Sequence, residues 1–246
     1  MKRFLTALQF LTRVNLIKNA YNPEDDFKDS TVFFPLVGLL IGGLLAMAAR
    51  AGSIFLQKPS TVLLVIVLEI VITGGLHHDG LMDSCDGLLS GCGREKMLEI
   101  MKDSRVGSMG VLGLVVHILI RVLLLLELPA NLYVQVLLVM PMLGRWAMAC
   151  AISLFPYAKQ EGLGKLFHGY SGKINLFWAS LYTLIFSIVI LPAKLYLALP
   201  LTLFCVYLAA KKINNALKGL TGDTYGLINE MTGSFFLFWS VFSGRF

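Results

Sequence analysis

Long apolar runs alternate with short polar segments along the 246 residues of the chain. A helix needs about 20 mostly apolar residues to cross a bilayer, and each run approaches that length or tilts to fit. The pattern predicts an all-α fold, a polytopic transmembrane helical bundle of about six or seven spans that forms one integral membrane domain over 1–246. The predicted spans are 33–50, 60–76, 107–127, 132–154, 174–193, 195–210 and 233–244.

Composition and charge support a membrane location. The chain is 57% hydrophobic with a mean hydropathy of +0.75, which excludes an ordinary soluble domain. With the N-terminus in the cytoplasm, 15 of the 21 Lys and Arg residues lie in cytoplasmic segments and 4 in outer ones. This asymmetry predicts a multi-pass protein of the cytoplasmic (inner) membrane. Anionic lipid and an anionic substrate account for the net charge of +6, so no nucleic-acid partner is expected.

Two polar-apolar segments predict helices that lie at the membrane surface. Phe4, Leu8 and Leu11 share one helical face close to the N-terminus, and no small-residue cleavage site follows them. The segment 94–110 has a similar apolar face and is predicted to be a cytoplasmic interfacial helix.

Three aspartates follow the second predicted span, within Thr73–Gly91. If a helix continues out of that span, Asp79, Asp83 and Asp86 lie on one face at i, i+4 and i+7. Their repulsion favours a divalent cation, because hard cations take carboxylate oxygens. The alternative is a helix end whose acids only face water, although acids at membrane depth favour a functional role.

Other polar groups lie near this stretch. His77 is a candidate for substrate binding, proton transfer or a local hydrogen bond, and these roles stay open, whereas His78 is expected to be exposed. Asp103 is a candidate fourth metal ligand, and Arg105 is a candidate phosphate ligand. A lone helix-end ion pair is the alternative for these two.

Two later loops combine glycines with hydroxyl groups and lysine, which suits phosphate binding without matching the P-loop pattern. The loop 161–169 contains Lys165, and the loop 217–226 contains Thr221 and Asp223.

Two arginines lie inside predicted spans, where an unpaired charge is costly. Arg145 forms either an internal salt bridge or a substrate clamp. Arg121 is equally ambiguous, with Glu69 and Glu127 as candidate partners.

Several ordered motifs resemble one family. The strings "FFPLVGLLIG", "TGGLHHDGLMDSCDG", "LEIMKDSRVG", "EGLGKLF" and "TGDTYG" are similar to those of cobalamin synthase, also called adenosylcobinamide-GDP ribazoletransferase, and the resemblance extends from "FLTR" to about Glu230. It implies a multi-pass, Mg²⁺-dependent enzyme of late vitamin B12 biosynthesis. The implied reaction joins adenosylcobinamide-GDP to α-ribazole, or to its 5′-phosphate, and yields adenosylcobalamin, or its 5′-phosphate, and GMP.

The resemblance also implies roles for residues. His77, Asp79, Asp83 and Asp86 match the family's acidic motif, and Asp103 and Arg105 match its "DSR" step. We expect the four aspartates to hold one or two Mg²⁺ ions, and one of them or His77 to accept the proton of the attacking hydroxyl. The catalytic candidates are thus His77, Asp79, Asp83, Asp86 and Asp103, and the phosphate-binding candidates are Arg105, Arg145, Lys165, Thr221 and Asp223.

Two other functions stay open from the sequence. One is a CDP-alcohol-type membrane phosphotransferase that acts on lipid, which performs analogous chemistry at aspartate-rich sites. The other is a cation-coupled transporter, which the absence of internal repeats disfavours. The sequence leaves a homo-oligomer open. The active site is expected to face the cytoplasm, and membrane lipid is an expected partner.

Overall fold

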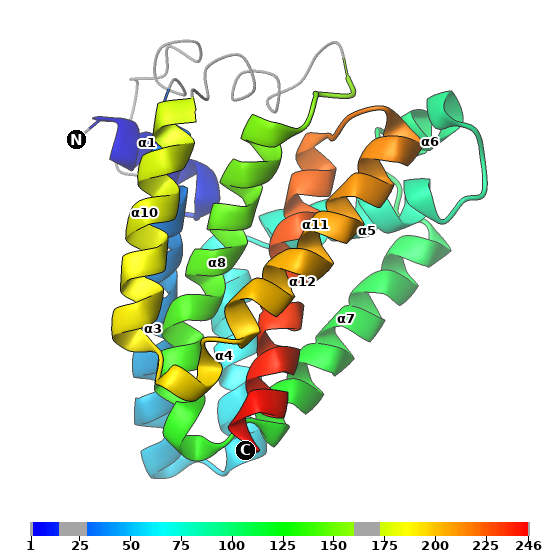
Figure 1. The fold of residues 1–246 in the computed structure, drawn as a ribbon. Coiled ribbons are helices and arrows are strands. Elements are labelled where there is room, and N and C mark those ends of the chain that lie inside the picture. The colour runs from blue at the N-terminus through cyan, green and yellow to red at the C-terminus, as the bar shows by residue number, and fades with distance from the viewer. Residues whose placement is uncertain (1, 15–28, 160–172, 246) are drawn as a thin grey trace.

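The computed structural model describes residues 2–14, 29–159 and 173–245, and these residues form a bundle of helices (Figure 1). Within these ranges there is no β-strand; one isolated parallel bridge joins Tyr157 to Leu220. The all-α fold predicted from the apolar pattern is confirmed. The elements are α1 (Lys2–Leu11), η1 (Ser30–Phe33), α3 (Phe34–Phe55), α4 (Lys58–Thr73), α5 (Leu76–Leu88), α6 (Arg94–Ile100), α7 (Ser108–Glu127), η2 (Ala130–Leu132), α8 (Tyr133–Leu154), α10 (Lys173–Ile190), η3 (Ala193–Leu195), α11 (Ala198–Leu217) and α12 (Gly222–Gly244).

Five helical segments of the described residues are long and apolar enough to cross a membrane: Ser30–Phe55, Ser108–Glu127, Ala130–Leu154, Lys173–Ile190 and Ala193–Leu217. A sixth is added if α4 and α5 count as one broken span. The seventh predicted segment, 233–244, is instead the second half of α12, which is not among these candidates. Polar residues in its first half, including Asn229 and Glu230, are buried, whereas Phe238 and Phe242 in its second half are exposed. The first half of α12 is therefore internal.

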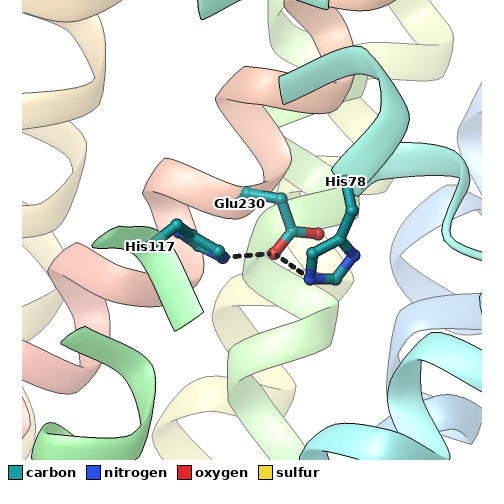
Figure 2. Close-up of side chains that lie close together, drawn as sticks. All are labelled: His78, His117 and Glu230. Carbon is teal, nitrogen blue, oxygen red and sulfur yellow. Dashed lines mark hydrogen bonds and ion pairs between the residues drawn. The ribbon is translucent and has the colours of Figure 1, made fainter. Parts of the chain in front are cut away.

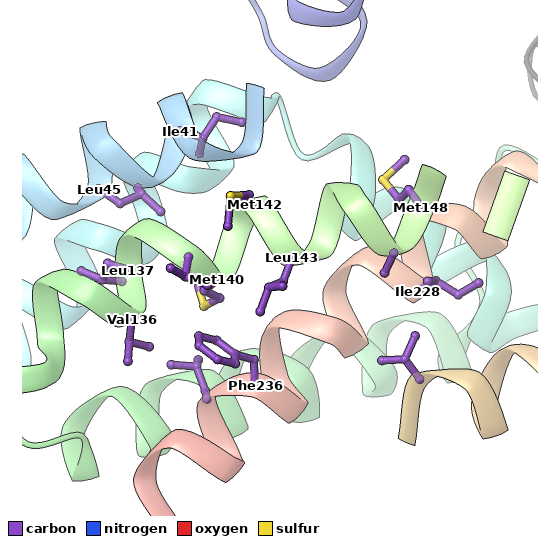
Figure 3. Packing of buried hydrophobic residues seen from close by; sticks show 14 of the residues in the cluster. Ile41, Leu45, Val136, Leu137, Met140, Met142, Leu143, Met148, Ile228 and Phe236 are labelled. Carbon is purple, nitrogen blue, oxygen red and sulfur yellow. The ribbon is translucent and has the colours of Figure 1, made fainter. Parts of the chain in front are cut away.

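The core is built around α8, which lies between α3 and α12 (Figure 3). Met140 and Leu143 of α8 and Phe236 of α12 are buried there. Against α3 the contact is closer, because Gly38 and Gly42 have no side chain and the backbone of α8 approaches them directly. A bulky apolar side chain on one helix and a glycine on another thus set the spacing of the three helices.

A sharp break separates α4 from α5. Gly74 and Gly75 both adopt left-handed backbone conformations, with φ of 65° and 72°, which glycine alone adopts without strain. The two helices therefore meet at 90°. The three aspartates do lie on one helix, α5, as predicted, but this helix does not simply continue the second span. α4 ends at Thr73, and α5 runs across one end of the bundle, outside the five spanning segments.

The two ends of the bundle carry different sets of charged residues. The end that carries α1, α5, α6 and the start of α12 is called the acidic end here, after the aspartates of α5 (Figure 1). At the opposite end Lys58 donates to the carbonyl of Leu126, Lys194 donates to the carbonyl of Gly244, and Arg245 pairs with Glu127. The Lys and Arg residues assigned to outer loops therefore gather at one end.

Both predicted surface helices form. On α1, Leu11 is buried and Phe4 packs its ring edge-on against Phe33, 5.9 Å between centroids. The second helix, α6, is shorter than the predicted 94–110, since it ends at Ile100 and the chain turns before α7. Met101 is buried against Gly87 of α5, which fastens this turn to the acidic end.

Candidate functional site

The acidic helix is placed by a glycine-to-backbone contact with α12. A Cβ at Gly80 would lie 2.7 Å from the carbonyl oxygen of Asp223, and one at Gly226 would lie 3.1 Å from that of His77. The two backbones therefore cross without side chains between them. This crossing brings the aspartates of α5 to the first turn of α12.

Carboxylates from both helices meet at this crossing. Asp79 is exposed, Asp83 is partly buried, and Asp223 of α12 lies beside them. Burial, together with the charges of Asp79 and Asp223, raises the pKa of Asp83 to about 6. Lys159 donates to Asp223 Oδ2 at 2.8 Å and opposes that shift. We call Asp79, Asp83, Asp223 and Lys159 the acidic cluster.

Asp86 binds the start of α7, a contact that the sequence did not reveal. Its Oδ2 accepts from the backbone N–H of Gly107 and its Oδ1 accepts from that of Gly110, both at 2.8 Å. These amides belong to the N-terminal turn of α7, where helical N–H groups lack intrahelical acceptors. Asp86 thus caps α7 and fixes it against α5.

Asp103 and Arg105 bind each other. Arg105 donates from Nε to Oδ1 at 3.1 Å and from Nη2 to Oδ2 at 2.8 Å, and its backbone N–H also reaches Oδ1. These bonds lower the pKa of Asp103 to about 2. Both side chains are exposed. The structure thus matches the helix-end ion pair named as the alternative for these residues, and it does not bring Asp103 into the acidic cluster.

Thr221 has a structural role at the start of α12. Its Oγ1 accepts from the N–H of Thr224, whose hydroxyl in turn accepts from the N–H of Thr221, and this reciprocal pair forms a capping box. Thr221 is fully buried. Next to it, Arg94 donates to the carbonyls of Leu217 and Ala158 and so ties α6, α11 and the segment before Lys159 together.

A buried ionic network lies deeper in the bundle. Arg121 of α7 donates to Glu69 of α4 at 2.6 Å and to Glu230 of α12 at 3.0 Å. His117 Nε2 lies 3.0 Å from the same Glu230 oxygen. Figure 2 shows this contact. The predicted partner Glu69 is confirmed for Arg121, whereas the other candidate, Glu127, pairs with Arg245 at the far end.

Arg145 and the two histidines border this network. Arg145 is buried and lies 3.8 Å from Glu69, so it forms the internal salt bridge that was one of its two predicted roles. His78 is buried, not exposed as predicted, because α7 and α12 cover it; its Nε2 is 3.9 Å from Glu230. Burial beside Arg145 lowers the pKa of His77 to about 3. His77 is therefore neutral at physiological pH and a weak base.

His78, His117 and Glu230 form the one group of three potential metal ligands, among the described residues, whose donor atoms all lie within 4.8 Å of one another (Figure 2). Arg121 already donates to the Glu230 oxygen that both histidines face. A cation there would lie beside a guanidinium, which electrostatics disfavours. The group is better described as part of the buried network.

One predicted phosphate-binding residue cannot be placed, and three residues of the site and the network were not predicted. Lys165 lies outside the described residues. Lys159, His117 and Glu230 were not singled out from the sequence, although an acid and a histidine within apolar runs are a signal for buried partners. No local pattern marks Lys159, since its role depends on the bridge between Tyr157 and Leu220 that places it beside Asp223.

A bundle of apolar spanning helices with carboxylates and a lysine gathered at one end defines a class: a polytopic α-helical membrane protein with an acidic site at the end of its bundle. Comparison with known proteins is more specific. The profile of the family described as Cobalamin-5-phosphate synthase matches residues 3–241. The chain belongs to this family.

Curated relatives cover nearly the whole chain. Proteins named adenosylcobinamide-GDP ribazoletransferase from Desulfitobacterium hafniense (strain Y51) and Alkaliphilus metalliredigens (strain QYMF) are each 37% identical to it, over 96% and 99% of this chain and 95% and 97% of their own. The one from Desulforamulus reducens is 38% identical over 94% of this chain and 93% of its own. No solved structure matches the chain.

Proposed function

We propose that this protein is an adenosylcobinamide-GDP ribazoletransferase of late cobalamin biosynthesis. It joins adenosylcobinamide-GDP to α-ribazole, or to its 5′-phosphate, and releases GMP. The observation that supports this most is the near-complete match to relatives that carry this name. The acidic cluster supports it from the chemical side, because phosphoryl-transfer sites hold cations that offset phosphate charge.

The acidic cluster is suited to Mg²⁺. Asp79, Asp83 and Asp223 offer the hard oxygen ligands that Mg²⁺ prefers. Burial raises the pKa of Asp83 most, and the charges of Asp79 and Asp223 raise it further despite the opposing charge of Lys159. These carboxylates would hold the ion, with Asp86 contributing only if it also keeps its bonds to α7. When bound, Mg²⁺ neutralises charge on the pyrophosphate oxygens.

The chain's own residues supply the remaining chemistry. A ribose hydroxyl oxygen forms a bond to a pyrophosphate phosphorus while the bond from that phosphorus to the oxygen of GMP breaks. Asp79, the exposed carboxylate of the cluster, accepts the hydroxyl proton. His77 is a poorer acceptor because it is buried and its pKa is low. Lys159, the cation of the cluster, offsets charge on the departing phosphate.

In this proposal the protein lies in the inner membrane of a bacterium or archaeon, and its site faces the cytoplasm. The excess of Lys and Arg in the segments assigned to that side supports the orientation. Exposed apolar side chains along α7, α10 and α11, such as Leu119, Val189 and Phe204, would contact lipid. Self-association of the chain remains a prediction.

The test is an assay of GMP release by the purified protein with adenosylcobinamide-GDP, α-ribazole and Mg²⁺. We expect Asp83→Asn to lose at least about 100-fold of the activity, since removing one preorganised electrostatic group typically costs that much. Mg²⁺ should raise the Tm of the unaltered protein and leave that of Asp83→Asn nearly unchanged. Glu99→Gln, on the exposed face of α6, is the matched control and should behave like the unaltered protein.

Two outcomes would reject the proposal. One is release of CMP from CDP-diacylglycerol with no GMP from adenosylcobinamide-GDP, which would indicate a lipid phosphotransferase. The other is full activity of Asp83→Asn, which would remove the acidic cluster from the mechanism.

A further inference from the structure

A cavity of about 500 Å³ opens at the break between α4 and α5. Small-molecule sites usually enclose about 300–1,000 Å³. The cavity lies on the α1 side of α5, and neither Asp83 nor Asp223 lines it. The polar side chains of its lining are those of Thr12, Arg13, Thr73, His78 and Asp79, and Gly74 and Gly75 also border it.

Arg13 is held at this cavity by its backbone and by the glycine turn. Its N–H donates to the carbonyl of Ile72 at 2.8 Å, which attaches the end of the N-terminal segment to the last turn of α4. Its side chain lies over Gly74, where a Cβ would overlap it. The diglycine break therefore both turns the chain and leaves room for the arginine.

The N-terminus of α5 opens on the same cavity. The cap residue Gly75 has no side chain to bind the first amides, and the N–H of Asp79 is the first to reach an intrahelical acceptor, the carbonyl of Gly75 at 2.9 Å. The helix has 13 residues, and its amides before Asp79 have no intrahelical acceptors. Such helix ends attract anions.

His78 gives an independent indication of a ligand. The residue is 7% exposed and lines the cavity. One ring nitrogen, Nε2, faces Glu230 in the buried network (Figure 2). The other, Nδ1, is buried with no hydrogen-bond partner among the described residues. A buried polar atom without a partner is costly. Nδ1 has almost no accessible surface, so a ligand oxygen in the cavity would satisfy it once the ring turns towards the cavity.

We propose that this cavity binds the phosphate monoester of the acceptor substrate, through Arg13, the N-terminus of α5 and His78. This inference rests on the proposed function and assigns α-ribazole 5′-phosphate to one side of α5. The negative charge of Asp79 repels the phosphate from the part of the cavity that Asp79 lines. The sugar phosphate therefore lies with its phosphate at Arg13 and its ribose hydroxyl towards Asp79, which the cavity shares with the acidic cluster.

The experiment compares two acceptors with the full-length protein in nanodiscs of neutral lipid, and repeats the comparison in nanodiscs that also contain anionic lipid. Arg13→Gln should raise the KM for α-ribazole 5′-phosphate by at least about tenfold, the cost of losing one charge-assisted hydrogen bond. It should change the KM for unphosphorylated α-ribazole and for adenosylcobinamide-GDP by less than about twofold, because neither places a monoester in the cavity. Arg13→Lys should recover part of the loss, since it keeps the charge.

Arg3→Gln is the matched control, since it removes the same charge from the same N-terminal segment, where Arg3 pairs with Asp29 outside the cavity. Arg3→Gln should leave the KM for both acceptors unchanged. Equal KM increases for both acceptors in Arg13→Gln, or none, would overturn the assignment. A KM that depends on anionic lipid in the nanodisc would reassign the cavity to a lipid headgroup and also overturn it. Calorimetric binding of α-ribazole 5′-phosphate without donor tests the cavity even if no GMP is released, which separates this inference from the proposed function.

Discussion

At the scale of single residues, Asp83 is held in an environment that opposes its charge. Desolvation and the neighbouring acids raise its pKa from 3.8 to about 6. Between those two pH values the folded protein binds more protons than the unfolded chain, and so the free energy of unfolding falls as the pH rises through this window. Above about pH 6 the full destabilisation by Asp83 is present.

Asp83→Asn should therefore stabilise the metal-free protein above pH 6 while it abolishes activity. The side chain is partly open to solvent, and we expect on the order of 1 kcal/mol after screening. That corresponds to a rise in Tm of about 2–4 °C for a chain of this size. The measurement is Tm in detergent with EDTA, at several pH values. The difference should shrink as the pH falls from about 6 towards 4; a variant less stable at pH 8, or a difference independent of pH, would contradict the argument.

At the scale of helices, the contact between α3 and α8 depends on glycine. A Cβ at Gly42 would lie 2.7 Å from the carbonyl oxygen of Leu137, and the backbone at Leu138 is closer still. Backbone atoms of a buried helix yield little, so Gly42→Ala should cost about 1–3 kcal/mol by forcing α3 and α8 apart. Thermal unfolding in detergent measures this loss as a lower Tm.

Gly43 provides the control on the same helix, one residue away. A Cβ there meets nothing within 4 Å. Gly43→Ala should be neutral or stabilising by up to about 1 kcal/mol, because alanine is the better helix former. Equal losses of stability in the two variants would show that the close approach of α8 does not set the cost at Gly42.

The sequence predicts well the features that depend on residues within one segment, and poorly those that depend on residues far apart in the chain. Apolar runs identify the spanning helices because hydropathy is a property of the run itself. The capping of α7 by Asp86 joins residues 21 positions apart, and no local pattern specifies it. The prediction that His78 is exposed was wrong, because α7 and α12, which bury it, are far from it in sequence. The pairing of Arg121 with Glu69 was among the expected solutions, because a buried charge requires a partner.

At the scale of the whole molecule, the buried network joins helices that are far apart in sequence. Arg121 connects α7 to Glu69 on α4 and to Glu230 on α12, and Arg145 of α8 lies beside Glu69. Apolar packing against lipid gives helices little preference for one partner over another, whereas buried charges that must meet are selective. The network also reaches His78, which lines the cavity at the α4–α5 break. The buried network therefore contributes both to the arrangement of the helices and to the position of His78 in the proposed phosphate site.

Arg121 should accordingly matter far more for stability than its charge alone suggests. Arg121→Met leaves Glu69 and Glu230 buried without their shared partner, and breaking a buried pair costs about 3–5 kcal/mol. Arg121→Lys keeps the charge but cannot reach both carboxylates equally well, so its loss should be intermediate. Arg245→Met breaks the pair with Glu127, whose side chains are 63% and 60% exposed, and should cost no more than about 1 kcal/mol. Denaturant unfolding in mixed micelles ranks the three variants. If Arg121→Met and Arg245→Met lose the same amount, the network does not hold the helices together, and apolar packing around α8 must account for their arrangement.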